Sequence, residues 1–381
     1  MKNINLLFFA PILIEFSNEA LSLQIPLIPY SLGYLLFIFI SFFCLIKFNK
    51  ELFFRNFFPI FLFWLGMLIG SFFADDINKS LSISIANIPY YLGCAFFSYY
   101  FFEKKFKKVV IVSFTIVFLV NMVYLLSHTI SGTSIVSYSA SALLDESIRN
   151  HHNVGFLISI SAIFLSTYLL FKNKSKLSYL IFLISLVLLV ISESRSNLLI
   201  SILSFLITIY FKYKTFKFVY VILIISILTI PIINILSDYD FLSKRFSISN
   251  TEYQLNTTDD RREILTKAPS VFYNNIFGRG NKEFRVKVGY NYIVSHNMYI
   301  TTLLAGGIIS FFGFFLLIFK TYKSIKFLNL INALSEYEKA LASLILTIFL
   351  TFFTIEFFGF NLLLLFSICF YFNYKSFKIK T

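Results

Sequence analysis

Charged residues are scarce in this chain: 14% of the 381 residues are Asp, Glu, Lys or Arg, whereas 58% are hydrophobic. Because a soluble globular domain has roughly 25% charged residues, this shortage excludes a soluble globular fold. The mean hydropathy of +0.79 agrees with that exclusion. The composition therefore predicts an all-α polytopic membrane protein, with residues 1–381 forming a single integral membrane domain.

Cysteine and the common metal-ligand patterns are also scarce. The three cysteines fall inside apolar stretches, and an odd number of buried thiols argues against a disulfide framework. The four histidines include the adjacent pair His151 and His152, which cannot readily chelate one ion from a helix, and no Cys-x-x-Cys or His-Glu-x-x-His pattern occurs. Neither an Asp-x-Asp motif nor a nucleotide-binding glycine loop is present. The sequence therefore predicts no metal and no cofactor.

Long apolar runs are abundant in this chain. Runs of roughly 17–22 residues are long enough to cross a bilayer as helices. About 12 transmembrane helices are predicted, and the first is read as a retained helix rather than a signal peptide. They lie near residues 5–22, 30–46, 57–74, 83–102, 109–127, 154–171, 177–192, 196–211, 216–236, 297–319, 340–355 and 357–374.

Lysine and arginine are distributed unevenly over the connections between these spans. Of the 33 basic residues, 21 lie at the termini or on every second connection, and 9 of the other 12 lie in residues 237–295. This alternation follows the positive-inside rule, which places both termini in the cytoplasm and the long loop 237–295 on the outer (periplasmic) side. The net charge of +14 is therefore mainly an orientation signal, and no nucleic-acid partner is predicted.

Arg195 lies in a turn of a few residues between two predicted spans on the outer side. A charge at this depth usually faces a polar cavity or a partner. Two interpretations stay open: Arg195 binds an anion at the mouth of a cavity, or it pairs with Glu193 and reaches the lipid headgroups.

The outer loop 237–295 is the only connection long enough to form a folded lid carrying short helices. Acidic residues precede Arg261, so a helix is expected to begin there and to run to about Tyr273. Gly278 and Gly280 then mark a tight connection. Arginines in such a loop can bind a phosphate through two parallel hydrogen bonds each. The alternative interpretation is that the loop is an inert cap whose charges are solvated.

His296 is the only histidine in that loop, and it precedes a long apolar span. A neutral imidazole is the natural general base near pH 7, and nearby arginines favour its neutral form. The alternative is a histidine that caps the helix or bonds a carbonyl group. A second outer polar cluster enters the span near 154–171, where Asn153 is also interpretable as a helix cap.

Three short segments follow one another over roughly residues 150–315. The first is an Asn-containing entry to a span, and the second is a Ser-Arg-Ser element. The third consists of a loop arginine, a glycine turn and a His-Asn-x9-Gly element. They are Asn150–Gly155, Ser194–Ser196, and Arg261–Gly280 with His296, Asn297 and Gly307. Together with the predicted topology they resemble the O-antigen ligase and polymerase superfamily of bacterial surface-polysaccharide assembly. Arg261 and Arg262 are adjacent here, and Arg261 is favoured for the family position by its distance to Gly278. The chain departs from the family pattern at Ser310, which replaces a second glycine after Gly307.

The resemblance implies a metal-independent, inverting glycosyltransferase in the bacterial inner (cytoplasmic) membrane. Its donor would be an undecaprenyl-pyrophosphate-linked oligosaccharide, and a chain-length regulator and a flippase are candidate partners besides the lipid bilayer. By this resemblance His296 is the catalytic base. Arg195, Arg261, Arg262 and Arg279 are the candidate pyrophosphate ligands, and Asn153, Asn297, Gly278 and Gly280 are the supporting residues.

The acceptor separates two reactions within this superfamily. A polymerase moves the growing chain onto another lipid-linked repeat unit, and a ligase moves the finished chain onto lipid A-core; the polymerase is the favoured expectation. A flippase or other transporter is the alternative of a different class. A transporter should show polar residues at mid-membrane or repeated halves, whereas the predicted spans here are nearly free of charge at their centres.

Overall fold

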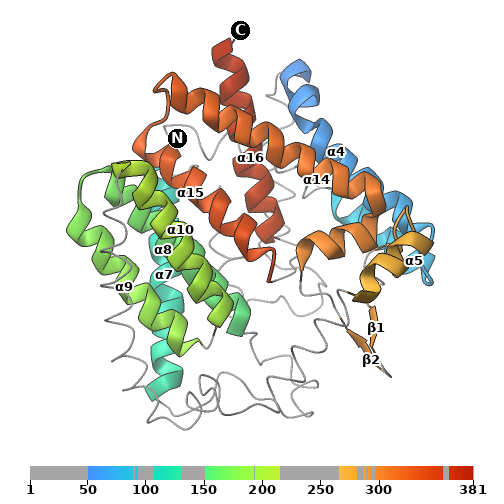
Figure 1. The fold of residues 1–381 in the computed structure, drawn as a ribbon, viewed down its shortest axis with the longest axis horizontal. Coiled ribbons are helices and arrows are strands. Elements are labelled where there is room, and N and C mark those ends of the chain that lie inside the picture. Colours follow the sequence, from blue (N-terminus) through green and yellow to red (C-terminus); the bar gives the residue numbers. More distant parts are fainter. Residues whose placement is uncertain are drawn as a thin grey trace, which may run out of the picture. The chain divides into compact units, whose positions relative to one another are not determined.

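The computed structural model describes residues 50–88, 91–92, 107–130, 151–192, 194–214, 266–280, 286–288, 291–293, 297–354 and 360–380. These residues belong to two compact units. Unit 1 takes its described residues from 105–250 and 334–351, and unit 2 takes them from 37–104, 251–333 and 352–381. Each unit consists mainly of helices (Figure 1), and four described helices are long and apolar enough to cross a membrane.

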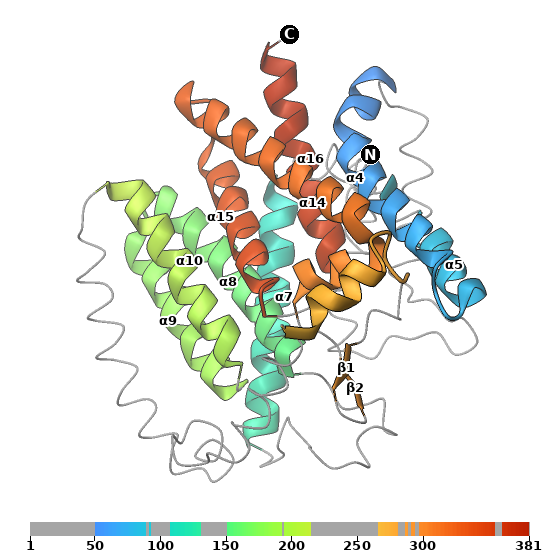
Figure 2. The ribbon, with the colours of Figure 1, turned by 45° about the vertical axis from the view of Figure 1, so that its right-hand side comes forward.

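Unit 1 is a bundle of five described helices, four of which pack around the fifth, α8. In Figures 1 and 2, α8, α9 and α10 lie side by side. In α8 the apolar window 154–171 is 89% buried, whereas the windows of α7 and α10 are only 39% buried, so α8 is the central helix and the other two present apolar surface outward. The five are α7 (Lys107–Ile130), α8 (His151–Phe171), α9 (Ser175–Ile191), α10 (Arg195–Tyr213) and α15 (Glu336–Thr351).

Aromatic and hydroxyl side chains hold this bundle together. The rings of Phe182 on α9 and Phe205 on α10 stack with centroids 4.0 Å apart. Between α8 and α10, the hydroxyl oxygens of Ser159 and Ser201 lie 2.6 Å apart, and both are fully buried. Short hydroxyl side chains let helix backbones approach closely and satisfy each other where water is absent.

The connection from α8 to α9 closes in a left-handed turn. Asn173 has φ of +61°, a conformation that asparagine tolerates better than most residues, and the N–H of Lys174 donates to the carbonyl oxygen of Leu169 (2.9 Å). From α10, Lys212 donates to the carbonyl oxygen of Leu170 and to the side-chain oxygen of Asn173. One lysine thus joins the C-terminal ends of α8 and α10.

Unit 2 is built around the crossing of α4 (Lys50–Ser71) and α14 (Met298–Leu330). The two helices approach closely because glycines face each other: a Cβ atom at Gly66 would overlap the backbone nitrogen of Ser310, and one at Gly313 would meet the backbone nitrogen of Phe63 at 2.5 Å. The hydroxyl of Ser310 donates to the carbonyl oxygen of Phe63 (2.6 Å). Ser310, the departure from the family's second glycine, is therefore a hydrogen-bonding contact here.

Smaller elements complete unit 2. Helix α5 (Ile77–Ala86) begins at Asp76, whose side chain accepts from the backbone N–H of Lys79 (3.0 Å), and it packs on α4 through three buried serine hydroxyls. Residues 266–274 are helical. The other elements are α16 (Phe360–Lys380) and an antiparallel pair, β1 (Val286–Val288) with β2 (Asn291–Ile293), in which Val286 lies opposite Ile293.

The helical prediction is confirmed where the structure describes the chain. Helices occupy the expected spans near 57–74, 109–127, 154–171, 177–192, 196–211, 297–319, 340–355 and 357–374, with ends shifted by several residues. The spans near 5–22, 30–46 and 216–236, and most of 83–102, lie outside the described residues, so twelve spans stay a prediction. The short β1–β2 pair was not predicted from the sequence.

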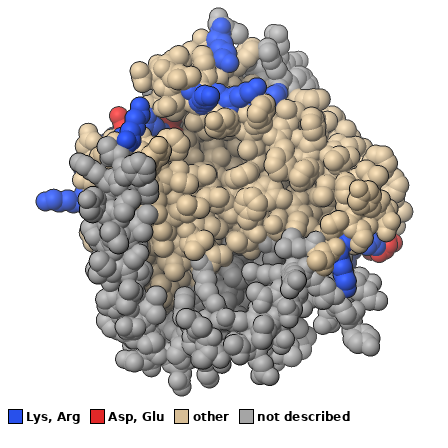
Figure 3. Space-filling view, viewed as in Figure 1, with Lys and Arg blue, Asp and Glu red and all other residues tan. Residues whose placement is uncertain are grey.

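Basic residues concentrate at particular helix ends. In unit 2 the C-terminal turns of α16 carry Lys375, Lys378 and Lys380, and Lys375 donates to the carbonyl oxygen of Ala333, just beyond α14 (2.8 Å). The charge pattern predicts that these two ends share one side of the membrane, and the contact agrees with that. Figure 3 shows a described surface that is mostly uncharged, with the basic side chains gathered at its margins.

Candidate functional site

Helix α14 breaks at Gly307, and residues 276–280 fill the break. Gly307 has φ of +63° and ψ of −163°, so the helix interrupts its own hydrogen bonding there. In a straight helix the N–H of Ile308 would donate to the carbonyl oxygen of Leu304. The N–H of Ile308 donates to the carbonyl oxygen of Ile276 instead (3.0 Å), and the Leu304 oxygen accepts from the N–H of Arg279 (2.8 Å).

A third hydrogen bond joins the same segment to α14: the N–H of Gly280 donates to the carbonyl oxygen of Ala305 (2.8 Å). Residues 276–280, here called the glycine turn, thus satisfy three backbone groups of α14. An unsatisfied polar group in a water-poor environment costs about 1–3 kcal/mol, so these bonds are a strong reason for the turn to stay docked.

Glycine is required at three points of this contact. Gly278 and Gly280 have φ of +90° and +80°, in the region that residues with a Cβ rarely adopt. An added Cβ would also overlap the carbonyl oxygen of Ala305 at Gly278, the hydroxyl of Ser80 at Gly280, and the carbonyl oxygen of Ile276 at Gly307. The predicted tight connection at Gly278 and Gly280 is confirmed, and its partner is the Gly307 of the His-Asn-x9-Gly element.

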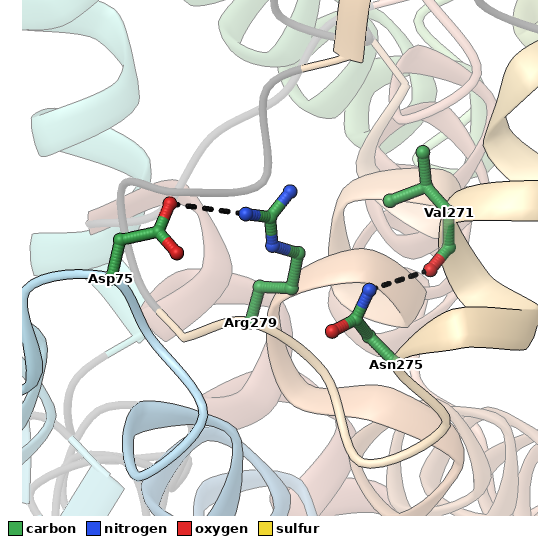
Figure 4. Close-up of polar contacts among 4 residues, drawn as sticks. All are labelled: Asp75, Val271, Asn275 and Arg279. Atoms are coloured by element: carbon green, nitrogen blue, oxygen red, sulfur yellow. Dashed lines mark hydrogen bonds and ion pairs between the residues drawn. The ribbon is translucent and has the colours of Figure 1, made fainter.

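The glycine turn presents the side chain of Arg279 beside Asp75. One guanidinium nitrogen lies 3.0 Å from a carboxylate oxygen of Asp75, in the connection between α4 and α5 (Figure 4). The side chains are 26% and 80% exposed, so the pair is open to solvent or to a ligand. Sequence reasoning missed Asp75, although an acidic residue in a predicted outer connection was a usable signal.

The helix before the glycine turn is the one expected from Arg261 to about Tyr273. Residues 266–274 are helical, and the side-chain amide of Asn275 donates to the carbonyl oxygen of Val271 (3.0 Å), which closes the last turn (Figure 4). The described part of that prediction is confirmed. Arg261 and Arg262 lie outside the described residues.

Asn297 caps the N-terminus of α14. Its side-chain oxygen accepts from the backbone N–H groups of Tyr299 (3.0 Å) and Ile300 (3.2 Å). Its side-chain amide donates to the carbonyl oxygen of Phe353 (3.3 Å), and the N–H of Met298 donates to that of Phe352 (2.8 Å). Asn297 is therefore the N-terminal capping residue of α14. His296 lies outside the described residues.

In unit 1 the Ser-Arg-Ser element begins α10. Ser194 is the residue before the helix, and its fully buried hydroxyl accepts from the side-chain amide of Asn197 (2.7 Å). Gly155 of α8 lies against this turn, since a Cβ there would meet the Ser194 Cβ at 2.6 Å. The turn therefore fixes Arg195 as the first residue of α10. The side chain of Arg195 is outside what the structure describes.

The interpretation of Asn153 as a helix cap is wrong. Helix α8 is already helical at His151, so Asn153 lies inside its first turn. Within the described residues, no group of three His, Cys, Asp or Glu side chains is placed to hold a metal ion.

The residues predicted for one site thus fall in two units. Unit 2 brings Arg279, Gly278 and Gly280 together with Gly307, and it also contains the cap at Asn297. In unit 1, Gly155 of α8 lies against the Ser194 turn that begins α10. Both arrangements belong to a helical membrane protein, and in unit 2 the glycine turn docks on a broken helix.

Residues 180–315 match a family model described as O-antigen ligase. The match contains the Ser-Arg-Ser element, the glycine turn and the His-Asn-x9-Gly element, and it confirms the resemblance to the O-antigen polymerase and ligase superfamily over those residues. Comparison with curated proteins and with solved structures gave no significant match.

Proposed function

We propose that this protein is a membrane glycosyltransferase that assembles a bacterial surface polysaccharide from an undecaprenyl-pyrophosphate-linked donor. The observation that carries the proposal is the family match over residues 180–315, which contains Arg195, Arg261, Arg279 and His296. Among the described residues, four helices long and apolar enough to cross a membrane support a reaction at the bilayer, where a lipid-linked donor lies.

The reaction forms one glycosidic bond and breaks one sugar–phosphate bond. His296 takes the proton of an acceptor hydroxyl, and the oxygen then attacks the anomeric carbon from the face opposite the leaving group. The bond from that carbon to the pyrophosphate oxygen breaks, and undecaprenyl pyrophosphate leaves with the electron pair. In-line displacement inverts the configuration at the anomeric carbon, and the imidazolium afterwards loses its proton to water.

The leaving pyrophosphate gains negative charge as the bond breaks, and cations placed in advance stabilise that charge. Arg195 and Arg261 or Arg262 are proposed for this role, with Arg279 as a further ligand. The exposed ion pair supports the assignment for Arg279, because a polyanion can replace the single carboxylate of Asp75. The backbone bonds of the glycine turn support it as well, because they fix the residue that carries this guanidinium.

Two acceptors are compatible with this chemistry. We favour the polymerase, in which another lipid-linked repeat unit at the periplasmic face accepts the chain, because the polymerases of this superfamily are so diverse. The ligase, in which lipid A-core accepts the chain, is the second candidate because the matching family model is described as O-antigen ligase.

The test is a gel profile of surface glycan from cells that lack the protein, complemented with the wild type or with His296→Ala. A polymerase predicts lipid A-core bearing one repeat unit after deletion, and a ligase predicts bare core with lipid-linked polymer accumulating. In either case His296→Ala should fail to restore the full glycan ladder although it is expressed normally. A full glycan ladder with His296→Ala would contradict the catalytic role of that residue.

A further inference from the structure

A cluster of lysines and aromatic rings in unit 1 has no role in the proposed reaction. The Nζ atom of Lys107, on α7, lies 5.4 Å from the ring centroid of Tyr168 and 5.7 Å from that of Tyr337. Lys172, just beyond α8, lies 5.3 Å from the same Tyr168 centroid. Lys339 of α15 lies 5.3 Å from the Phe171 centroid. The lysine–aromatic cluster consists of Lys107, Lys172, Lys339, Tyr168, Phe171 and Tyr337.

The lysines of this cluster have no ion-pair partner among the described carboxylates. Two ammonium groups share the ring of Tyr168, and none of Lys107, Lys172 and Lys339 forms an ion pair with a described carboxylate. The nearby carboxylate of Glu338 is buried and accepts from the N–H and hydroxyl of Ser335 (both 2.8 Å), where it helps to cap α15. Like charges held together favour a bound anion.

The cluster also contains a buried donor. Tyr337 is 2% exposed, and its hydroxyl has no hydrogen-bond partner among the described residues. A phenol is protonated near neutral pH, so this group can donate to an acceptor. A buried polar group without a partner in a folded protein requires an explanation, and a bound ion is one of the usual ones.

The position of the cluster indicates the source of that anion. Its members come from the end of α8, the start of α15 and the first described residue of α7, where the distribution of charge predicts the cytoplasmic membrane surface. Lysine stems and tyrosine rings are amphipathic and are enriched at this depth, with the polar end among the headgroups. Basic pockets between helix ends on this side suit lipid phosphates.

We propose that the lysine–aromatic cluster binds the phosphate group of an anionic lipid from the cytoplasmic leaflet. The three ammonium groups surround the phosphate oxygens, the hydroxyl of Tyr337 donates to one of them, and the acyl chains lie along the apolar outer surface of α7. This binding is separate from glycosyl transfer, so the proposal holds or fails without reference to the donor or the acceptor.

The experiment compares the melting temperature of the purified full-length protein in detergent after adding phosphatidylglycerol, phosphatidylcholine or inorganic phosphate. The wild type should gain several degrees with phosphatidylglycerol and much less with the other two. The triple variant Lys107→Gln, Lys172→Gln and Lys339→Gln should lose most of that gain. The matched control is Lys108→Gln, Lys174→Gln and Lys176→Gln, which removes the same charge from exposed lysines of the same unit and should retain the gain.

A gain that persists in the triple variant, or that phosphatidylcholine produces equally, would overturn the proposal. A full gain with inorganic phosphate alone would overturn the lipid as its source. Tyr337→Phe keeps the ring and removes only the hydroxyl, so it tests the site even if the triple variant does not fold: its gain with phosphatidylglycerol should fall below that of the wild type, and an unchanged gain counts against the site as drawn.

Discussion

The carbonyl oxygen of Leu304 accepts a hydrogen bond from the backbone N–H of Arg279, 2.8 Å away, although the two residues lie on different elements. The bond exists because Gly307 breaks α14 and removes the partner that Leu304 would have in a straight helix. The main chain at Arg279 is therefore fixed by backbone atoms alone. Its side chain remains available for the ion pair with Asp75 or for a substrate.

Gly278→Ala should lower the melting temperature by several degrees and reduce activity. The new Cβ would overlap the carbonyl oxygen of Ala305, and the positive φ adds a backbone cost of about 1–3 kcal/mol. Thermal unfolding in detergent measures the change. The control is Ile276→Ala, which shortens an exposed side chain of the same turn but keeps the carbonyl that accepts from Ile308. Equal melting temperatures for the two variants would contradict the docked geometry.

Arg279→Ala should lower glycan transfer by at least about tenfold, because it removes a proposed pyrophosphate ligand.

Asp75→Asn should change the melting temperature little, since exposed ion pairs contribute roughly 0–1 kcal/mol. If Asp75 competes with the substrate for Arg279, the Asn variant should also show a lower KM for the lipid-linked donor. A tenfold loss of transfer in Asp75→Asn with an unchanged KM would argue that the carboxylate itself is required.

Asn297 offers a way to separate capping from the contact with Phe353. Asn297→Ala loses both, and removal of a helix cap costs about 0.5–2 kcal/mol. Asn297→Asp keeps the acceptor for the N–H groups of Tyr299 and Ile300 but cannot donate to Phe353. The Asp variant should therefore melt above the Ala variant. If the two melt together below the wild type, the bond to Phe353 and not the cap provides the stability.

Gly155 and Ser194 should show a coupled effect on stability. Gly155→Ala places a methyl group against the Ser194 side chain and should lower the melting temperature. Ser194→Gly removes that side chain together with the hydroxyl that accepts from Asn197, so it should lower the melting temperature by itself. The double variant should therefore lose less than the sum of the two single losses. Strict additivity would indicate that the two positions do not touch.

The sequence predicted the helices of this protein well, because a membrane leaves few alternatives for a long apolar run. It also predicted the helix before the glycine turn and the turn itself, where Gly278 and Gly280 have the positive φ values that favour glycine. These features depend on local chemistry. Residues close in sequence decide them, so no knowledge of the fold is needed.

The contacts of the candidate site were not predictable in the same way. Nothing near Gly307 in the sequence indicates that residues 276–280 supply its missing hydrogen bonds, because backbone groups are identical in every residue. The pairing of Arg279 with Asp75 joins positions 204 residues apart. The cap at Asn297 was missed, although asparagine is a preferred residue at this position; its contact with Phe353, 56 residues away, has no local signal in the sequence.

The break in α14 also bears on how the protein is made. If α14 kept its break in lipid without the glycine turn, the carbonyl groups of Leu304 and Ala305 and the N–H of Ile308 would have no partner. The glycine turn lies upstream in the chain, so ribosomes deliver it first and it is already present when the broken helix leaves the translocon. The upstream segment can therefore act as an intramolecular chaperone for the helix that follows it.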